Sequence, residues 1–235
     1  MSMHPMVQYL IEEMERNRDP EKAKPMQAYM KTDQPFYGIQ AKPRREIFRK
    51  AKRKFPIDSR EEWEQVGRQL WTGEHREEMY MALEVAERYK QFRDEEAMPL
   101  FEYLAETAPH WDTLDWIAGK LISSLILAHR EFESKLREWR ESENLWMRRA
   151  SLLAHLKHKE ETNTELLAKS VLLLAHEDEF FIRKAIGWVL RDYSYANPDW
   201  VQEFVDKHAA ELSGLSRREA LKKINRDRKK QKTKQ

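Results

Sequence analysis

The residue pair with the clearest chemical potential is Trp111 and Asp115, which lie four positions apart in the sequence. Residues at this spacing share one face of an α-helix, so an indole ring would stand beside a carboxylate. Such a pair stabilises positive charge, because the carboxylate attracts a cation and the aromatic face adds a cation–π contact. These two residue types therefore favour a substrate that carries or develops a positive charge.

Asp115 also interrupts an internal repeat of 35 residues. Four segments align at this offset, and they begin at Trp111, Trp146, Phe181 and Ser216. Of the leading aromatic residues, we expect Trp146 and Phe181 to pack in the core. The three later copies carry alanine where the first has Asp115, namely Ala150, Ala185 and Ala220. Upstream of the segments, apolar residues three apart recur as Phe101 and Leu104, Leu136 and Trp139, and Val171 and Leu174. Helix pairs at this period predict an all-α fold, a HEAT-like or ARM-type α-solenoid of antiparallel pairs.

A repeat array forms one continuous core, so we expect a single domain over residues 1–224. The whole chain has a formal net charge of +2, but ten Lys or Arg and two Asp or Glu lie between 216 and 235. A nucleic acid would therefore have to bind a local basic stripe. Residues 225–235 are interpreted as a basic, frayed tail. Near the other end, Asp19 followed by Pro20 predicts the start of a helix.

Several common classes of site are excluded by composition and motifs. The chain has no cysteine, which removes disulfides, thiolate nucleophiles and Cys-based zinc sites, and it has no Gly-rich phosphate loop, HExxH or GxSxG. His155 and His158 lie three apart without a neighbouring carboxylate, so we expect surface residues and no metal. No cofactor is predicted. No segment approaches the roughly 20 apolar residues of a membrane span, and we expect a soluble cytoplasmic protein without a membrane partner.

Equivalent helices of a solenoid stack side by side, so residues at one repeat position form a row on one face. One row reads Thr113, Arg148, Arg183 and Arg218, and Arg149 and Lys184 lie beside it. Cations in a row on a concave face suit the phosphates of a DNA backbone. An alternative of equal weight is that these arginines form salt bridges between repeats, with Glu143, Asp178 and Glu179.

A carboxylate among those cations weakens anion binding, so Asp115 requires its own explanation. It is either a structural charge satisfied by a neighbour such as Arg149, or a residue that acts on a cationic substrate. On a polyanion, the obvious cations are alkylated purines and the oxocarbenium sugar that forms when their glycosidic bond breaks. Asp115 would stabilise that sugar and orient a water molecule, as the carboxylates of glycosidases do.

Five stretches of the sequence match one known family. They cover residues 25–31, 36–40 with 43–45, 111–115, 144–150 and 180–191. On these residues the chain resembles, over nearly its whole length, the bacterial AlkD-type DNA glycosylases. These HEAT-like repeat proteins excise N3- and N7-alkylated purines from DNA.

The resemblance implies a role for several residues of this sequence. It makes Asp115 the catalytic carboxylate, Trp111 and Trp188 the aromatic walls, and Tyr29 a residue beside the lesion. It makes Arg149 a contact to the DNA backbone, and we expect support from Arg148, Arg183, Lys184 and Arg218. It further implies hydrolysis without base flipping, in which the cationic base needs no other activation. The expected partner is double-stranded DNA with alkylated bases, bound by a monomer in the bacterial cytoplasm at the nucleoid.

Two other functions remain open on the sequence. A non-catalytic protein that binds DNA structures would use the same groove but would release no base. A protein-interaction scaffold is a common role of helical solenoids, and an exposed apolar groove would favour it. The row of arginines argues against the scaffold.

Overall fold

A computed structural model of the chain describes residues 2–232, which contain helices and no strand. The expected all-α fold is therefore confirmed for this part of the chain. Two compact units follow one another, the first ending at Leu100 and the second beginning at Phe101. Each is described by itself below, and the assignment of residues 1–224 to one domain stays a prediction. Within residues 2–232, no helix combines the length and apolar character that crossing a membrane requires.

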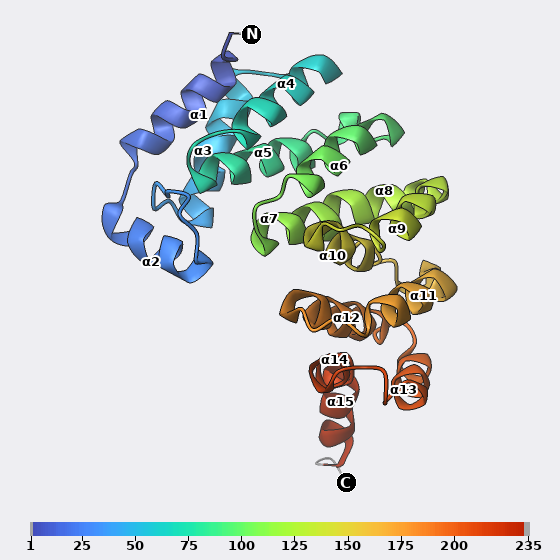
Figure 1. Cartoon of the computed structure of the whole chain (residues 1–235). Helices are drawn as coiled ribbons and strands as arrows, with labels where there is room; N and C mark the ends of the chain where they lie inside the picture. The colour runs from blue at the N-terminus through green and yellow to red at the C-terminus, as the bar shows by residue number, and fades with distance from the viewer. Residues whose placement is uncertain (1, 233–235) are drawn as a thin grey trace. The chain divides into compact units, whose positions relative to one another are not determined.

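The first unit is built from five α-helices (Figure 1). They are α1 (Pro5–Arg16), α2 (Pro20–Met30), α3 (Ala41–Lys54), α4 (Arg60–Trp71) and α5 (Arg76–Arg88), followed by the short turns η1 (Lys90–Phe92) and η2 (Glu95–Ala97). Helix α1 packs on α3 and α4, and α4 packs on α5. As predicted, Asp19 caps α2, because its side chain accepts a hydrogen bond from the backbone N–H of Lys22 at 3.2 Å.

The loop between α2 and α3 is held by a buried carboxylate. Glu77 of α5 accepts hydrogen bonds from the backbone N–H groups of Tyr37, Gly38 and Ile39 at 2.9–3.0 Å. Gly38 has φ +88°, and a Cβ atom there would lie 2.1 Å from the carbonyl oxygen of Asp19. Only glycine allows this close approach, so the loop fixes the start of α2 against the rest of the unit.

The second unit repeats a helix pair four times. The first helices of the pairs are α6 (Met98–Glu106), within which the unit boundary falls, α9 (Glu133–Trp139), α11 (Thr164–Leu174) and α13 (Pro198–Lys207). The second helices begin with α7 (Trp111–Trp116), α10 (Leu145–Leu153), α12 (Phe180–Tyr193) and α14 (Gly214–Ala220). Helix α7 continues through a π-helical segment, η3 (Ile117–Ile122), into α8 (Ser123–Ala128). The remaining elements are η4 (Arg130–Phe132), η5 (Lys159–Glu161) and α15 (Lys222–Lys232).

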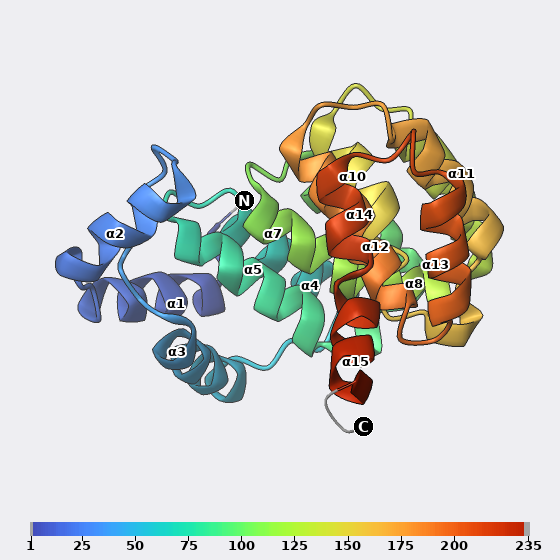
Figure 2. The same cartoon turned by 90° about the horizontal axis from the view of Figure 1, so that it is seen from below.

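The second helices stack in chain order, with α7 on α10, α10 on α12 and α12 on α14. Figure 1 shows this succession, and Figure 2 shows α10, α12 and α14 overlapping when the stack is viewed from below. The six repeated apolar residues identified in the sequence are all buried, with no more than 3% of their surface exposed. Ala150, Ala185 and Ala220 are fully buried. The sequence repeat therefore corresponds to a continuous core between stacked pairs.

Three expectations were wrong. The tail predicted to fray from residue 225 is helical as far as Lys232, whereas 233–235 lie outside the described residues. Ile224 is 7% exposed and anchors the helix on α14, and Lys223 pairs with Asp227 at 3.2 Å. Trp146 and Phe181, assigned to the core, are half-buried and contact each other with ring centroids 5.2 Å apart.

The third wrong expectation concerns His155 and His158, which are buried and only 3% and 2% exposed. The cause is Ser123 of α8, whose hydroxyl donates to the carbonyl of Leu156 and whose carbonyl lies 2.9 Å from Nε2 of His158. These bonds draw the turn after α10 onto α8. Among residues 2–232, no group of three or more His, Asp or Glu is arranged to hold a metal ion.

Candidate active site

The centre of the candidate site is an ion pair between α7 and α10. Nε of Arg149 lies 2.8 Å from Oδ1 of Asp115, and Nη2 of Arg149 lies 2.9 Å from Oδ2. Both side chains are largely withdrawn from water, with 16% of the Asp115 side chain and 5% of the Arg149 side chain exposed. This bidentate geometry fixes the plane of the carboxylate as well as its position.

A third contact holds Arg149 in place. Its Nη1 donates to the backbone carbonyl of Phe181 at the start of α12, and its guanidinium carbon lies 5.8 Å from the centre of the Phe181 ring. Arg149 therefore links α7, α10 and α12. A guanidinium has five N–H groups, and these contacts use three of them. The orientation of Asp115 is thus determined by the stacking of three consecutive repeats.

Burial and pairing act in opposite directions on the carboxylate. Burial raises the pKa of Asp115 above its usual value, and the hydrogen bonds and charge of Arg149 oppose that rise. Asp112, one turn away on α7, adds a further upward contribution. The contact of two guanidinium N–H groups with two oxygens fits the ionised form of Asp115.

The backbone also departs from regular geometry next to Asp115. Helix α7 ends at Trp116, and the π-helical segment Ile117–Ile122 follows directly. Short π-helical insertions in α-helices occur frequently at functional sites. The wider turn follows Asp115 immediately, at the one repeat whose alanine has been replaced by a carboxylate.

The aromatic residues predicted for the site lie in different places. Trp111 opens α7, one turn before Asp115, and is half-buried. Trp188 lies in α12, the helix whose first turn accepts Arg149, and is also half-buried. Tyr29 belongs to α2 of the first unit, where its side chain is 73% exposed. Of the predicted set, the structure brings Asp115 and Arg149 into direct contact.

Two arginines of the predicted phosphate row form salt bridges. Arg148 contacts Glu177 at 2.8 Å and donates to the backbone carbonyls of Ser142 and Glu143. Arg183 pairs with Asp178 and donates to the carbonyl of Glu177. Arg148 therefore forms a salt bridge between repeats, as the alternative proposed, but with Glu177, which the sequence had not suggested. Arg183 pairs with the suggested Asp178, which lies in its own repeat.

Two other predicted cations line a cavity at the far end of the stack. Lys184 of α12 pairs with Glu219 of α14 at 3.1 Å, and the exposed Arg218 lies beside it. Three further cations of the cavity, Arg226, Lys229 and Lys230, belong to the segment predicted to fray, and two more, Lys222 and Lys223, come directly before it. Their helical spacing was the signal that would have placed them together.

The arrangement at Asp115 suits the stabilisation of a cation. Each carboxylate oxygen has about two acceptor positions, and Arg149 occupies one on each. The remaining positions can accept a hydrogen bond from water, and the negative charge stands at an edge that solvent reaches. Arg149 therefore orients the carboxylate without using all of its accepting capacity.

Comparison with known proteins identifies the family of the chain. The family model described as "DNA alkylation repair enzyme" matches residues 10–224. A solved structure named "Predicted DNA alkylation repair enzyme from Enterococcus faecalis" is similar, with 32% identity, a TM-score of 0.80, and coverage of 87% of this chain and 95% of that chain. No curated protein matches the chain.

Two structures from Streptococcus mutans share the fold at lower identity. AlkD2 is 18% identical with a TM-score of 0.60, and the match covers 85% of this chain and 97% of that chain. The protein smu.31 from strain UA159 is 16% identical with a TM-score of 0.59, and the match covers 92% and 97%. These likenesses bear on the fold alone, and with them the predicted HEAT-like helical repeat fold is confirmed.

Proposed function

The chain belongs to the DNA alkylation repair enzymes, and from that premise we propose that it is a monofunctional DNA glycosylase. Its substrates are N3- and N7-alkylated purines in duplex DNA, which carry a positive charge. It hydrolyses their N-glycosidic bond as a monomer in the bacterial cytoplasm and needs no cofactor.

The observation that carries this proposal is the bidentate pair of Asp115 and Arg149. When the C1′–N bond of an alkylated purine breaks, both electrons leave with the base, which becomes neutral. The positive charge passes to the deoxyribose as an oxocarbenium ion. A carboxylate of fixed orientation stabilises that charge more than it stabilises the ground state, because no reorganisation is needed when the charge develops.

Asp115 also has a role in the addition of water. A water molecule hydrogen-bonded to a free lone pair of Asp115 adds its oxygen to C1′, and its proton passes to the carboxylate or to solvent. The product is an abasic sugar and a free base. Because the base leaves as a neutral molecule, no acid has to protonate it, which fits a site with one oriented carboxylate and no base flipping.

The other predicted residues complete the proposed site. Arg149 is a positioning residue for Asp115, and its two remaining N–H groups can take a backbone phosphate. Trp111 and Trp188 form aromatic walls beside the deoxyribose, and Tyr29 contacts the lesion side. The phosphates are held by cations of the stacked helices, namely Arg148, Arg183, Lys184 and Arg218.

The proposal is tested by base release. Duplex DNA treated with a methylating agent is incubated with the full chain, and free 7-methylguanine and 3-methyladenine are measured by chromatography. The proposal predicts release of at least one of these bases by the wild type. If neither base is released while the protein still binds the same DNA, the proposal is wrong.

One observation favours a second candidate, a DNA-binding protein without catalysis. Every carboxylate oxygen of Asp115 already has a partner in Arg149, which is also the geometry of a structural ion pair. In that case neither the wild type nor Asp115→Asn would release a base, and the substitution would change only the stability of the protein. The base-release experiment separates the two candidates.

A further inference from the structure

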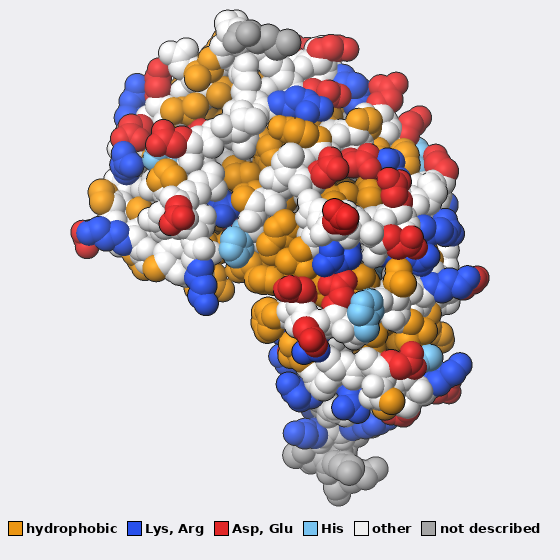
Figure 3. All heavy atoms as spheres, in the orientation of Figure 1, with side chains coloured by type: hydrophobic (Ala, Val, Ile, Leu, Met, Phe, Trp, Pro, Cys, Tyr) orange, Lys and Arg blue, Asp and Glu red, His pale blue; other side chains and the backbone are white. Residues whose placement is uncertain are grey.

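A basic groove occupies the end of the second unit, between α12 on one side and α14 with α15 on the other. The cavity has a volume of about 1350 Å³, and eight Lys or Arg but one carboxylate, Glu219, line it. Figure 3 shows Lys and Arg side chains gathered over α14 and α15. We refer to this cavity as the C-terminal groove.

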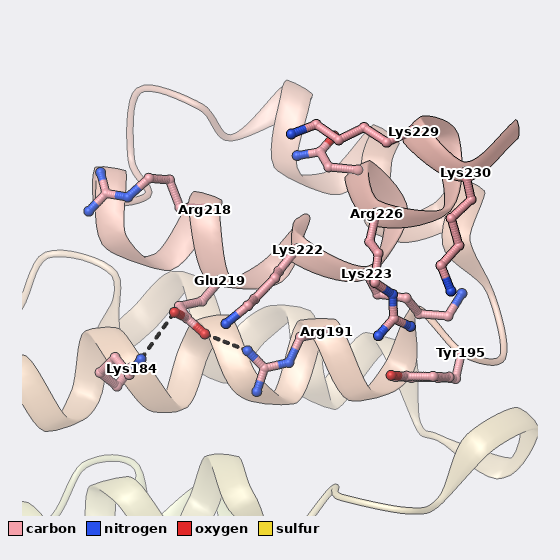
Figure 4. Close-up of a pocket in the computed structure, with 11 residues that line it drawn as sticks. Lys184, Arg191, Tyr195, Arg218, Glu219, Lys222, Lys223, Arg226, Lys229 and Lys230 are labelled. Atoms are coloured by element: carbon pink, nitrogen blue, oxygen red, sulfur yellow. Dashed lines mark hydrogen bonds and ion pairs between the residues drawn. The ribbon is translucent and has the colours of Figure 1, made fainter. Parts of the chain in front are cut away.

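Helical spacing places the cations of each wall on one face. On α12, Lys184 and Arg191 are seven residues apart, and Tyr195 follows four residues later. On α15, Lys222, Arg226 and Lys230 follow one another at intervals of four. Figure 4 shows Lys222, Arg226 and Lys230 directed toward α12, whereas Arg218 and Lys229 point away from it.

The single carboxylate of the groove is already fully engaged. Glu219 pairs with Lys184 at 3.1 Å and with Arg191. Burial raises the pKa of Glu219, but the hydrogen bonds from Lys184 and Arg191 outweigh it and hold the pKa below its usual value. Glu219 is therefore ionised and neutralises part of the charge on α12, which leaves the cations of α15 to other partners.

The cations of α15 have few such partners. Asp227 lies 3.2 Å from Lys223 and 3.6 Å from Arg226. Within residues 2–232, Lys222 and Lys230 form no ion pair, and both are exposed. Like charges four residues apart destabilise a helix by a few tenths of a kcal/mol per pair. The groove thus carries an excess of positive charge that a bound polyanion would relieve.

We propose that the C-terminal groove binds the sugar–phosphate backbone of duplex DNA at a distance from the alkylated base. The inference rests on the proposed function, because it treats the groove and Asp115 as two parts of one DNA-binding surface. The size of the cavity suits a run of phosphates better than one inorganic anion. Tyr195, 62% exposed and 4.8 Å from Nζ of Lys223, offers an apolar contact to a deoxyribose.

The stacking of the second helices sets the distance between the two parts. Asp115 lies on α7, and the two walls of the groove are α12, two helices along the stack, and α14, three helices along it. Packed helices lie roughly 8–10 Å apart, which puts the walls about 16–20 Å and about 24–30 Å from α7. Successive phosphates of one strand advance about 3.4 Å along the duplex. The groove therefore contacts phosphates roughly five to nine nucleotides from the alkylated base.

The test compares two triple variants with equal loss of charge. The groove variant carries Lys222→Gln, Arg226→Gln and Lys230→Gln. The control variant carries Lys207→Gln, Arg217→Gln and Arg228→Gln, three exposed cations of α13, α14 and α15 whose side chains do not line the groove. Glutamine keeps a helix propensity close to that of lysine and arginine, and circular dichroism checks that both variants stay folded.

Affinity for undamaged duplex DNA is then measured between 50 and 200 mM salt. Each lost phosphate contact lowers the slope of log affinity against log salt by about 0.9. The groove variant is expected to lose about 3 units of slope, whereas the control variant keeps the wild-type slope. Equal slopes for the wild type and the groove variant, or equal losses in both variants, would overturn the inference.

A series of duplex lengths locates the contact. For the wild type, affinity for a duplex with a central alkylated base is expected to rise until each flank covers about nine nucleotides. For the groove variant, affinity is expected to stop rising once each flank is longer than about four nucleotides. A rise identical to that of the wild type would contradict the proposed position. Both binding results are independent of base release, so a failure of the glycosylase proposal and a failure of this inference are distinguishable.

Discussion

Two charged regions of the second unit differ in how their charges are satisfied. At Asp115 one carboxylate meets one guanidinium, both nearly buried and joined by two hydrogen bonds of 2.8 and 2.9 Å. In the C-terminal groove eight cations face one carboxylate, and most of them are exposed. Buried, paired charges hold a fixed geometry, whereas exposed charges of one sign attract a polyanion. The comparison assigns orientation to the first region and affinity to the second.

The cations between the two regions are intermediate in character. Arg148 and Arg183 occupy equivalent positions on α10 and α12. Each donates to a backbone carbonyl of the turn before its own helix, and each also pairs with a carboxylate, which is Glu177 for Arg148 and Asp178 for Arg183. To contact DNA, these arginines have to replace some of these hydrogen bonds with hydrogen bonds to phosphate oxygens. The positive charge available to a phosphate is therefore greatest in the groove, smaller at Arg148 and Arg183, and smallest at Arg149.

The largest expected effect comes from breaking the buried pair. Arg149→Met leaves the charge of Asp115 buried without its partner, and we expect a loss of about 3–5 kcal/mol in the free energy of unfolding. Urea denaturation measures this loss. The double variant Arg149→Met with Asp115→Asn removes the buried charge as well and is expected to recover a large part of it. A single variant as stable as the wild type would show that the pair is not buried as described.

The next effect concerns the contact that builds the groove. Helix α14 approaches α12 at Gly187, where an added Cβ would lie 2.4 Å from Cβ of Glu219 and 3.0 Å from the carbonyl oxygen of Ser216. Gly187→Ala is expected to push α14 outward and to cost about 1–3 kcal/mol. It is also expected to weaken binding to undamaged DNA. Gly67→Ala, whose Cβ would meet one side-chain atom at 3.9 Å, is the control and should change neither quantity much.

Buried His155 extends the comparison to a titratable side chain that burial keeps neutral. Within residues 2–232 neither ring nitrogen has a hydrogen-bond partner, and burial, with the charges of His158 and Arg130, lowers the pKa to about 3 from 6.5. Between these values the unfolded chain binds more protons than the folded one, so stability is complete above pH 6.5 and is lost as pH falls. At pH 5 the expected loss is about 2 kcal/mol.

Urea denaturation at pH 7.5 and pH 5 checks this pH dependence. His155→Leu is expected to reduce the loss of stability between the two pH values, whereas His176→Leu, at an exposed position, should keep the wild-type loss. If the wild type and His155→Leu lost the same free energy, the protonation of His155 would not be its cause.

The smallest effect is expected for the exposed ion pair of Arg183. Its partner Asp178 has 96% of its side chain exposed, and such pairs contribute at most about 1 kcal/mol. Arg183→Ala should therefore leave the urea midpoint nearly unchanged and should lower DNA affinity by about one phosphate contact. If Arg183→Ala lost as much stability as Arg149→Met, buried and exposed ion pairs would not differ in their contribution to stability as described.

Much of the second unit was predictable because its repeat is visible in the sequence. The burial of Phe101, Leu136 and Val171 follows from a period of 35 residues combined with helical spacing. The pairing of Asp115 with Arg149 was one of the two alternatives that the sequence left open, because a carboxylate at a buried repeat position needs a counter-charge or a function. Periodicity reports which face of a helix is covered, and that was sufficient for these residues.

The errors arose where the path of a turn decides the contacts. Arg148 pairs with Glu177 of the next repeat, and His158 is drawn inward by the carbonyl of Ser123. Both contacts join residues about 30 positions apart, and no local pattern specifies them. The helix α15 is different, since the spacing of Lys222, Arg226 and Lys230 was visible but was outweighed by the prevalence of frayed basic termini.

The most direct test measures chemistry and binding on the same DNA. Single-turnover release of 7-methylguanine and the dissociation constant for the methylated duplex are determined for the wild type, Asp115→Asn and the control Asp199→Asn, an exposed carboxylate of α13. The account predicts that Asp115→Asn slows release by about 10²–10³-fold while its dissociation constant stays near that of the wild type, and that Asp199→Asn changes neither. Release by Asp115→Asn at the wild-type rate would contradict it.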